Sequence, residues 1–145
     1  MKSKEIKIKY VRDDMERIKA IKNGDWIDLR TGIDLMMRKG DFRLIPLGVA
    51  MKLPENTEAL LIPRSSTFKK YGIIQANSVG LIDETYCGEQ DEWLFPAYAT
   101  KDIVIPKNTR ICQFRIQEHQ PKVTITEVEF LSDNSRGGFG STGER

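Results

Sequence analysis

The chain has 145 residues, of which 39% are hydrophobic, and this is enough for one domain with a core of its own. Charged residues make up 30% and nearly cancel to a net charge of +2, which argues against direct binding of nucleic acid through a basic face. No stretch has the character of a membrane span or a signal peptide, and the two cysteines stand in no metal-ligand spacing. We therefore expect a cytoplasmic protein with free thiols and no membrane contact.

His119 is the only histidine of the chain, and it lies in a polar stretch. A Ser–His–Asp triad would have to use it, and a zinc site would lack further ligands. We expect this imidazole on an exposed loop. Hydrolytic chemistry should therefore rest on carboxylates, together with a metal ion that the substrate carries in.

The first part of the chain predicts a strand and then a helix. Residues 6–10 alternate between apolar and polar side chains, as strands do. Residues 14–22 place Met15, Ile18 and Ile21 on one stripe, and an Asn-Gly pair follows as a helix terminator. We interpret this helix as a cover of the core without chemistry of its own.

Residues 25–35 alternate polar and apolar side chains, so that Asp28 and Asp34 can share one face. The sequence supports two interpretations of Asp34 equally. It is either a carboxylate in the outer shell of a site or an exposed residue at the end of a strand.

Short β segments follow at residues 42–45, 48–53 and 58–62, separated by proline or polar breaks. Short strands at close spacing with turn signals between them are typical of an all-β sandwich or barrel. The pattern does not fit alternating strands and helices.

Residues 63–72 interrupt this rhythm with one short helix. Ser65 and Ser66 suit its N-cap, and Gly72 suits its end. Unpaired N–H groups, two hydroxyls and Arg64 at the start of the helix favour an anion such as phosphate. The alternative is an ordinary capped helix with a solvated arginine.

Residues 77–88 form the stretch on which the functional hypothesis depends. The pattern predicts a hairpin whose tip holds a carboxylate, Asp83, beside a ring, Tyr86. Gly80 and Gly88 stand where a strand bends or lets another group approach its backbone. Such a carboxylate can activate water next to a planar ligand, or it can simply belong to a turn.

Further strands are predicted at residues 93–99, 103–105 and 110–116, and the last of these places Gln113 opposite the face of its apolar residues. Residues 123–130 continue with a strand pattern that slips in phase halfway. That slip predicts a bulge or the end of a strand.

The last residues, 135–145, are rich in glycine and have little to bury except Phe139. Such a segment is either a flexible tail or an arm that becomes ordered on its ligand. In the second case Arg136, Ser141, Thr142 and glycine N–H groups would bind phosphates, and Phe139 would stack on a base.

Five blocks along the whole chain resemble the trimeric dUTP diphosphatases (dUTPases), and the similarity extends to the Bacillus and phage branch of that family. The blocks are residues 31–35, 63–66, 77–88, 110–113 and 136–143. The resemblance implies a jelly-roll-like β-sandwich or barrel of residues 1–134 with one or two short helices. It also implies a flexible arm, residues 135–145, and a homotrimer in which each arm closes a neighbouring subunit's active site.

The activity that the resemblance implies is hydrolysis of dUTP to dUMP and pyrophosphate, which limits uracil in DNA and supplies dUMP for dTMP synthesis. Asp83 would be the general base, and Mg²⁺ would be held by the triphosphate and waters, with Asp34 in the second shell. The implied substrate contacts are Arg64, Ser65, Ser66, Gln113, Arg136, Ser141 and Thr142 on phosphates, and Asn77, Gly80, Ile82, Tyr86, Phe139 and Gly140 around the nucleoside.

Physical chemistry supports the implied choice of base and sugar. Backbone groups in fixed order suit uracil, whereas cytosine would leave buried polar groups unpaired at a cost of roughly 1–3 kcal/mol each. Tyr86 under the sugar would leave no room for a ribose 2′-hydroxyl.

The chain also departs from the family pattern. Only two glycines separate Arg136 from Phe139, residues 89–93 are unusually acidic and aromatic, and helix 14–22 looks like an addition. Two other functions remain as alternatives. One is a dCTP deaminase-like enzyme, and the other is a nucleotide-gated protein that regulates a protein partner.

Overall fold

A computed structural model describes residues 3–19 and 24–138 of the chain, and its elements are nearly all strands. In this part of the chain, eleven strands and one helix run in the following order: β1 (Lys7–Tyr10), β2 (Ile27–Arg30), β3 (Leu35–Met37), β4 (Phe42–Pro46), β5 (Val49–Lys52), β6 (Thr57–Pro63), α1 (Thr67–Tyr71), β7 (Ile73–Gln75), β8 (Gly80–Asp83), β9 (Leu94–Ala99), β10 (Ile103–Ile105) and β11 (Arg110–Glu118). This confirms the all-β prediction.

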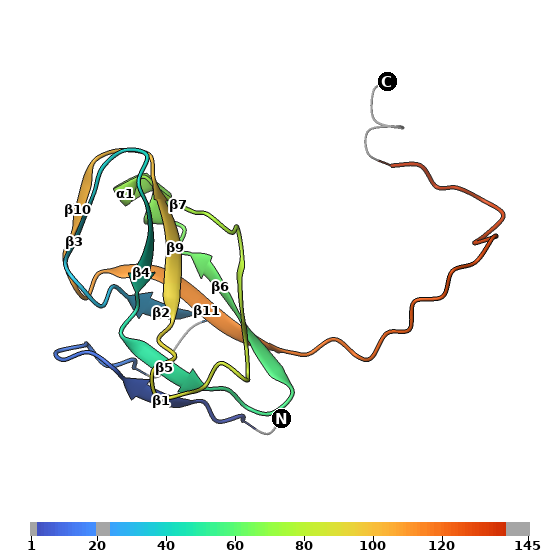
Figure 1. Ribbon diagram of the computed structural model, residues 1–145, viewed down its shortest axis with the longest axis horizontal. Coiled ribbons are helices and arrows are strands. Elements are labelled where there is room, and N and C mark those ends of the chain that lie inside the picture. The colour runs from blue at the N-terminus through green and yellow to red at the C-terminus, as the bar shows by residue number, and fades with distance from the viewer. Residues whose placement is uncertain (1–2, 20–23, 139–145) are drawn as a thin grey trace.

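The strands form four antiparallel sheets around one core (Figure 1). The largest sheet has the order β2-β11-β6-β8, and a second has the order β4-β9-β7; the pairs β1-β5 and β10-β3 complete the body. Burial alternates along β6 and β9, as expected for strands with one face on a core. At the centre, Trp93 and Phe114 are fully buried and meet edge to face, with ring centroids 5.1 Å apart.

The helix predicted at 14–22 is wrong over its described part, because residues 14–19 are not helical. Asp14 has a positive φ of 59°, which no helix accepts. The carbonyl of Asp14 accepts a bond from Asn108 Nδ2 (2.8 Å), and Glu16 N donates to Asn108 Oδ1 (3.0 Å). The side chain of Asn108, in a distant turn, thus binds backbone groups that would pair with each other in a helix. Met15 is buried in the core next to Gly48.

The helix after β6 forms where it was predicted, but its start is held differently. Gly72 ends it in the left-handed conformation, as expected. Ser66 occupies the N-cap position without a capping bond from its side chain. Instead, Arg64 N donates to Thr67 Oγ1 (3.0 Å), and that hydroxyl donates to Ile111 O (2.7 Å), which fixes the start of the helix to β11.

The predicted hairpin at 77–88 is only half present. β8 pairs with β6, and the residues between β8 and β9 form no strand. A turn follows Asp83, with Tyr86 N bonded to Asp83 O (3.0 Å). The return segment is held by polar side chains, since Asp91 Oδ2 accepts from Gly88 N (2.8 Å).

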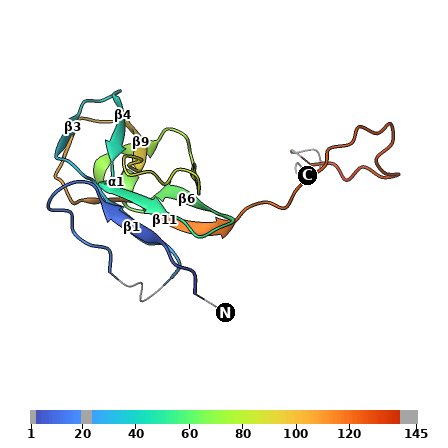
Figure 2. The ribbon, with the colours of Figure 1, turned by 60° about the horizontal axis from the view of Figure 1, so that its bottom comes forward.

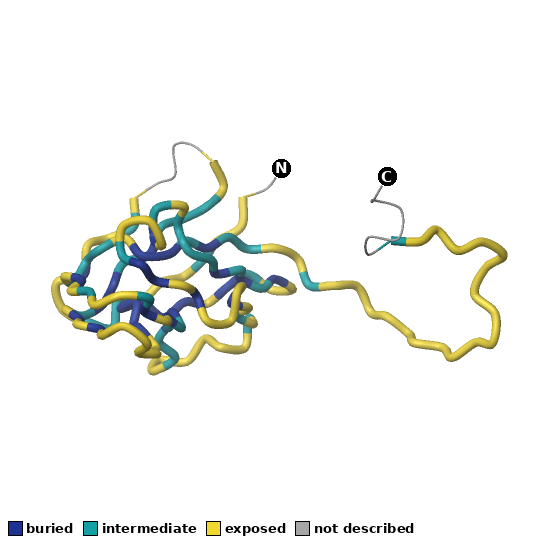
Figure 3. The backbone as a smooth tube through the Cα atoms, turned by 90° about the horizontal axis from the view of Figure 1, so that it is seen from above, coloured by how far each residue is buried: buried dark blue, intermediate teal, exposed yellow. Residues whose placement is uncertain are grey.

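After β11 the chain leaves the body (Figures 1 and 2). Residues 120–138 contain no strand and are almost all exposed, as Figure 3 shows, and the side chain of Ile125 is 94% exposed. The strand predicted within 123–130 is therefore wrong for this chain alone, because no free sheet edge lies beside that segment. The boundary at residue 134 stays a prediction. Among the described residues, no helix combines the length and the apolar character that crossing a membrane requires.

Candidate functional site

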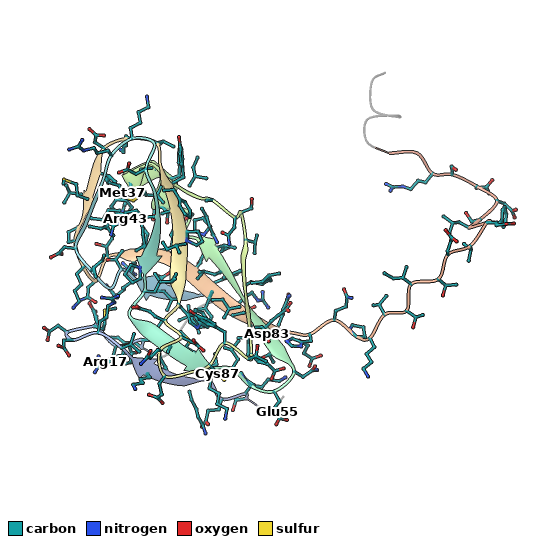
Figure 4. All side chains as sticks on the ribbon, in the orientation of Figure 1. Arg17, Met37, Arg43, Glu55, Asp83 and Cys87 are labelled. Atoms are coloured by element: carbon teal, nitrogen blue, oxygen red, sulfur yellow. The ribbon has the colours of Figure 1, made fainter. Side chains whose placement is uncertain are left out.

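Asp83 is the last residue of β8, opposite Glu58 of β6, at the edge of the body from which the C-terminal segment departs (Figure 4). Its Oδ2 accepts bonds from Thr85 N (3.1 Å) and Thr85 Oγ1 (2.5 Å). These bonds, and to a lesser degree the charge of a nearby imidazole, lower the pKa of Asp83 below its usual value. The carboxylate is half exposed and ionised at neutral pH, as a base must be.

A cavity of about 350 Å³ opens beside this carboxylate. It is lined by Leu81, Ile82, Asp83, Tyr86, Glu92, Trp93 and Leu94. Tyr86 donates its hydroxyl to Glu92 O (2.8 Å), which holds the ring at the cavity wall. The volume lies at the lower end of the range for small-ligand sites.

The strand that carries Asp83 approaches its partner closely. A Cβ on Gly80 would lie 3.2 Å from Leu61 Cβ, so this glycine is needed for the packing of β8 on β6. Asn77 is exposed in the turn before β8, and Ser78 next to it has a φ of 62°. Asn77, Gly80, Ile82 and Tyr86 thus accompany Asp83 along one segment.

A second polar cluster lies at the other end of β6. Arg64 Nε is 3.2 Å from Asp28 Oδ1, and Arg110 Nη1 is 3.5 Å from Asp28 Oδ2. Gln113 faces Asp28 across the β11-β2 pair and donates Nε2 to Pro63 O (3.2 Å). Two cations and an amide around one carboxylate can bind an anion with several oxygens.

The serines predicted for this cluster follow Arg64 directly. Ser65 is exposed and Ser66 is partly exposed, at the start of α1. Arg64, Ser65, Ser66 and Gln113 are therefore neighbours, as their predicted role requires.

Asp34 is not part of either cluster. Its Oδ1 accepts a bond from Lys107 N (2.7 Å) at the turn before β11. Asp28 and Asp34 do not share a face of one strand, because β2 ends at Arg30 and β3 belongs to another sheet. The carboxylate that the structure brings to Arg64 is Asp28.

Asp28, Arg110 and His119 are the residues at these clusters that the sequence prediction missed as functional. An acid between two apolar residues, Ile27 and Leu29 of β2, was a usable signal for Asp28. Nothing local indicated His119, whose Nε2 lies 3.3 Å from Asp83 Oδ1. Its approach depends on the register of β11 against β6.

Arg136 is exposed on the segment that extends away from the body. Phe139, Gly140, Ser141 and Thr142 lie outside the described residues, so their roles stay predictions.

Two clusters of this kind, on an antiparallel β body, are the arrangement expected of a protein that binds a phosphorylated ligand next to a carboxylate. The dUTPase family model matches residues 26–143, and the chain belongs to the dUTPase family. This confirms the resemblance seen in the sequence.

Known relatives indicate the branch of the dUTPase family to which the chain is similar in sequence. It is 53% identical over 141 residues, 97% of this chain and 99% of the other, to the SPbeta prophage-derived deoxyuridine 5′-triphosphate nucleotidohydrolase YosS of Bacillus subtilis. This supports the Bacillus and phage branch.

Solved structures share the jelly-roll-like fold. A mutant dUTPase of Staphylococcus bacteriophage 80alpha, in a structure with dUpNHpp, matches with a TM-score of 0.77 and 19% identity, over 97% of this chain and 99% of that chain. A mutant dUTPase of S. aureus phage phi11, whose structure shows the coordination of a structural Mg(II) ion, matches with a TM-score of 0.74 and 14% identity, over 87% of this chain and 97% of that chain.

Proposed function

We propose that the protein hydrolyses dUTP to dUMP and pyrophosphate, with Asp83 as the general base, and so limits uracil in DNA and supplies dUMP. The observation that carries this proposal is the presence of a cation cluster beside one end of β6 and of a carboxylate, Asp83 of the neighbouring β8, beside the other end. One group of residues suits a triphosphate, and the other suits a nucleoside and an attacking water. Relatives named for hydrolysis of deoxyuridine triphosphate support the same activity.

Asp83 takes the proton of the water that attacks the α-phosphorus. Its Oδ2 is held by Thr85, so Oδ1 is the oxygen left to accept that proton. The low pKa of Asp83 keeps it ionised through the working range of pH. The bond between the α-phosphorus and the bridging oxygen breaks, so dUMP carries the oxygen of water and pyrophosphate leaves with the bridging oxygen.

Arg64, Arg110 and Gln113 bind and orient the phosphate chain, with the hydroxyls of Ser65 and Ser66 beside them. Asp28 lies between both arginines and fixes their side chains in the absence of substrate. Bidentate arginine contacts give phosphate both charge and orientation.

Mg²⁺ fits this cluster as an ion that arrives on the substrate. Phosphate oxygens and water are the hard ligands it prefers, and it commonly keeps several waters. Asp28, the carboxylate between the arginines, is placed to accept hydrogen bonds from such waters. The ion supplies charge neutralisation on the triphosphate.

Within one chain the two clusters lie far apart. Glu58, opposite Asp83, and Pro63, next to Arg64, lie five residues apart on β6. At about 3.3 Å per residue this is a separation of roughly 17 Å. This separation favours an active site that combines the Asp83 end of one subunit with the Arg64 end of another, as in the expected homotrimer.

Exposed apolar surface supports this assembly. Phe42, Tyr98 and Ile74 lie in register across β4, β9 and β7, and each is more than 40% exposed. Leu44 extends the same face. A contiguous apolar sheet face of this kind is typical of a protein interface. The arm, with Arg136 and Phe139, would then reach a neighbouring subunit's site.

Backbone groups of residues 77–82 read uracil in this proposal, and Tyr86 lies against the deoxyribose. Cytosine would leave polar groups unpaired at roughly 1–3 kcal/mol each. A cytoplasmic location is part of the proposal, supported by two free cysteines, Cys87 and Cys112.

The test is pyrophosphate release from dUTP, dTTP, dCTP and UTP, each with and without Mg²⁺. We expect rapid turnover of dUTP alone, and only with the ion. Ammonia release from dCTP would favour the deaminase-like alternative. Binding of dUTP without product would favour the regulatory protein, and either result would overturn the proposal.

A further inference from the structure

The single histidine of the chain contacts the proposed base. His119 follows β11 directly, and its N–H donates to Asn56 O (2.9 Å). Its Nε2 lies 3.3 Å from Asp83 Oδ1 and 3.8 Å from Glu84 Oε1. Nε2 is shielded from solvent and has no well-directed hydrogen bond within the described residues. The ring is therefore aimed between two carboxylates rather than exposed on a loop, contrary to the expectation from sequence.

Every other group around this contact is held in place. Thr85 binds Asp83 Oδ2 through both its amide and its hydroxyl. Asn56 N donates to both carboxylate oxygens of Glu84 (3.2 Å each). The contacts of His119 Nε2 with Asp83 Oδ1 and Glu84 Oε1, by contrast, join side chains alone.

Other charged groups on the neighbouring strands are engaged elsewhere. Gln117 Nε2 binds the carboxylate of Glu58, and Glu118 lies 3.8 Å from Lys4 Nζ. Among the described residues, His119 is the one side chain able to carry positive charge within 4 Å of Asp83 or Glu84.

We propose that His119 is a positioning residue for Asp83 that makes hydrolysis dependent on its own protonation. The protonated ring donates Nε2–H to Asp83 Oδ1 and so occupies the oxygen that accepts the proton of water. The neutral ring loses this attraction and leaves Oδ1 to the water. The inference rests on the proposed role of Asp83 as the base.

A pH profile of kcat separates this role from a structural one. Imidazoles ordinarily titrate near pH ~6.5 and carboxylates near ~4, so the two groups control different parts of the profile. We expect the activity of the unchanged protein to fall at least about tenfold between pH 7.5 and pH 5.5, as the imidazole takes up a proton.

His119→Gln keeps a polar, uncharged side chain and removes the group that takes up a proton. We expect its kcat to change by less than about threefold over the same interval. In this variant, only protonation of the carboxylate lowers kcat, and carboxylates take up protons at lower pH. Glu118→Gln is the matched control, because it neutralises the adjacent side chain, which does not touch Asp83. Its kcat should fall between pH 7.5 and pH 5.5 as in the unchanged protein. The same acid fall in His119→Gln would overturn the inference.

A second measurement needs no variant at position 119. Because the chain has one histidine, its ring proton signals in an NMR spectrum of the untagged protein are unambiguous. We expect them to move at lower pH in Asp83→Asn than in the unchanged protein, since a neighbouring negative charge stabilises the imidazolium. Identical titrations would overturn the contact.

Failure of the inference and failure of the proposed function are distinguishable. If Asp83→Asn keeps full activity, the function assigned to Asp83 is wrong. If Asp83→Asn is inactive while His119→Gln retains the acid fall, Asp83 is the base and His119 is only structural.

Discussion

The two ends of β6 differ in the sign of their charge. At the Pro63 end, Arg64 and Arg110 surround a single carboxylate, Asp28. At the Thr57 end, Asp83 and Glu84 surround a single histidine. In the proposed function, the first arrangement binds an anion and the second activates water.

Their separation has a physical use. A carboxylate base within reach of two arginines would form ion pairs with them, and it would lose both its free lone pairs and much of its basicity. The length of one strand prevents this inside a subunit. In the proposed trimer, the two ends come together where another subunit and the substrate's own negative charge intervene.

The largest expected effect is at the acidic end. Asp83→Asn removes the base but keeps the shape and the bond from Thr85, so kcat should fall by about 10²–10⁴-fold. Binding of a non-hydrolysable dUTP analogue, measured by calorimetry, should persist because the cation cluster is untouched. Substantial turnover by this variant would show that another group removes the proton.

Subunit mixing tests whether the two ends meet between chains. Asp83→Asn and Arg64→Ala should each be nearly inactive, yet co-expressed chains should regain activity. In a mixed trimer, two chains carry one change and the third carries the other, and each site draws Asp83 from one subunit and Arg64 from another, so about one site in three is intact. Two affinity tags allow purification of the mixed species. Activity no greater than that of the two variants alone would place both residues in one subunit's site.

Much of the body could be predicted from the sequence because its signals are local. Alternation located β1, β4, β6 and β9 within a few residues, and Gly72 marked the end of α1. The acidic turn at Asp83 was likewise visible. Local sequence patterns predict strands and helices and the residues at which they end.

The features that were not predicted from the sequence share a different cause, because each depends on a residue far away in the chain. Asn108 takes backbone groups of residues 14–16 and prevents a helix, and Thr67 replaces Ser66 in fixing the start of α1. His119 reaches Asp83 only through the pairing of β11 with β6. No periodicity within one segment reports such contacts.

The arm gives the next effect in size. Removal of the residues after Asn134 should leave the thermal unfolding temperature unchanged, because residues 120–138 bury almost nothing in the chain's own body. Turnover should fall, since base stacking by an aromatic such as Phe139 is worth roughly 1–3 kcal/mol, about one or two powers of ten. Phe139→Ala separates stacking from the phosphate contacts of Arg136. Loss of the trimer on truncation, seen by light scattering, would identify a structural tail.

The last prediction concerns KM for dUTP and distinguishes Asp28 from Asp34, the two acids that alternation placed together. Asp28→Asn should loosen Arg64 and Arg110 and raise KM for dUTP, because a hydrogen bond to a charged group contributes about 1.5–3 kcal/mol, or roughly ten- to a hundredfold. Asp34→Asn keeps an oxygen able to accept from Lys107 N, so its KM should change less.

The pair is well matched, because both changes remove one negative charge and keep the side-chain shape. A larger effect at Asp34 would mean that the assembled trimer brings the turn before β11 to the phosphates, and that Asp28 serves only to hold β2 against its neighbours.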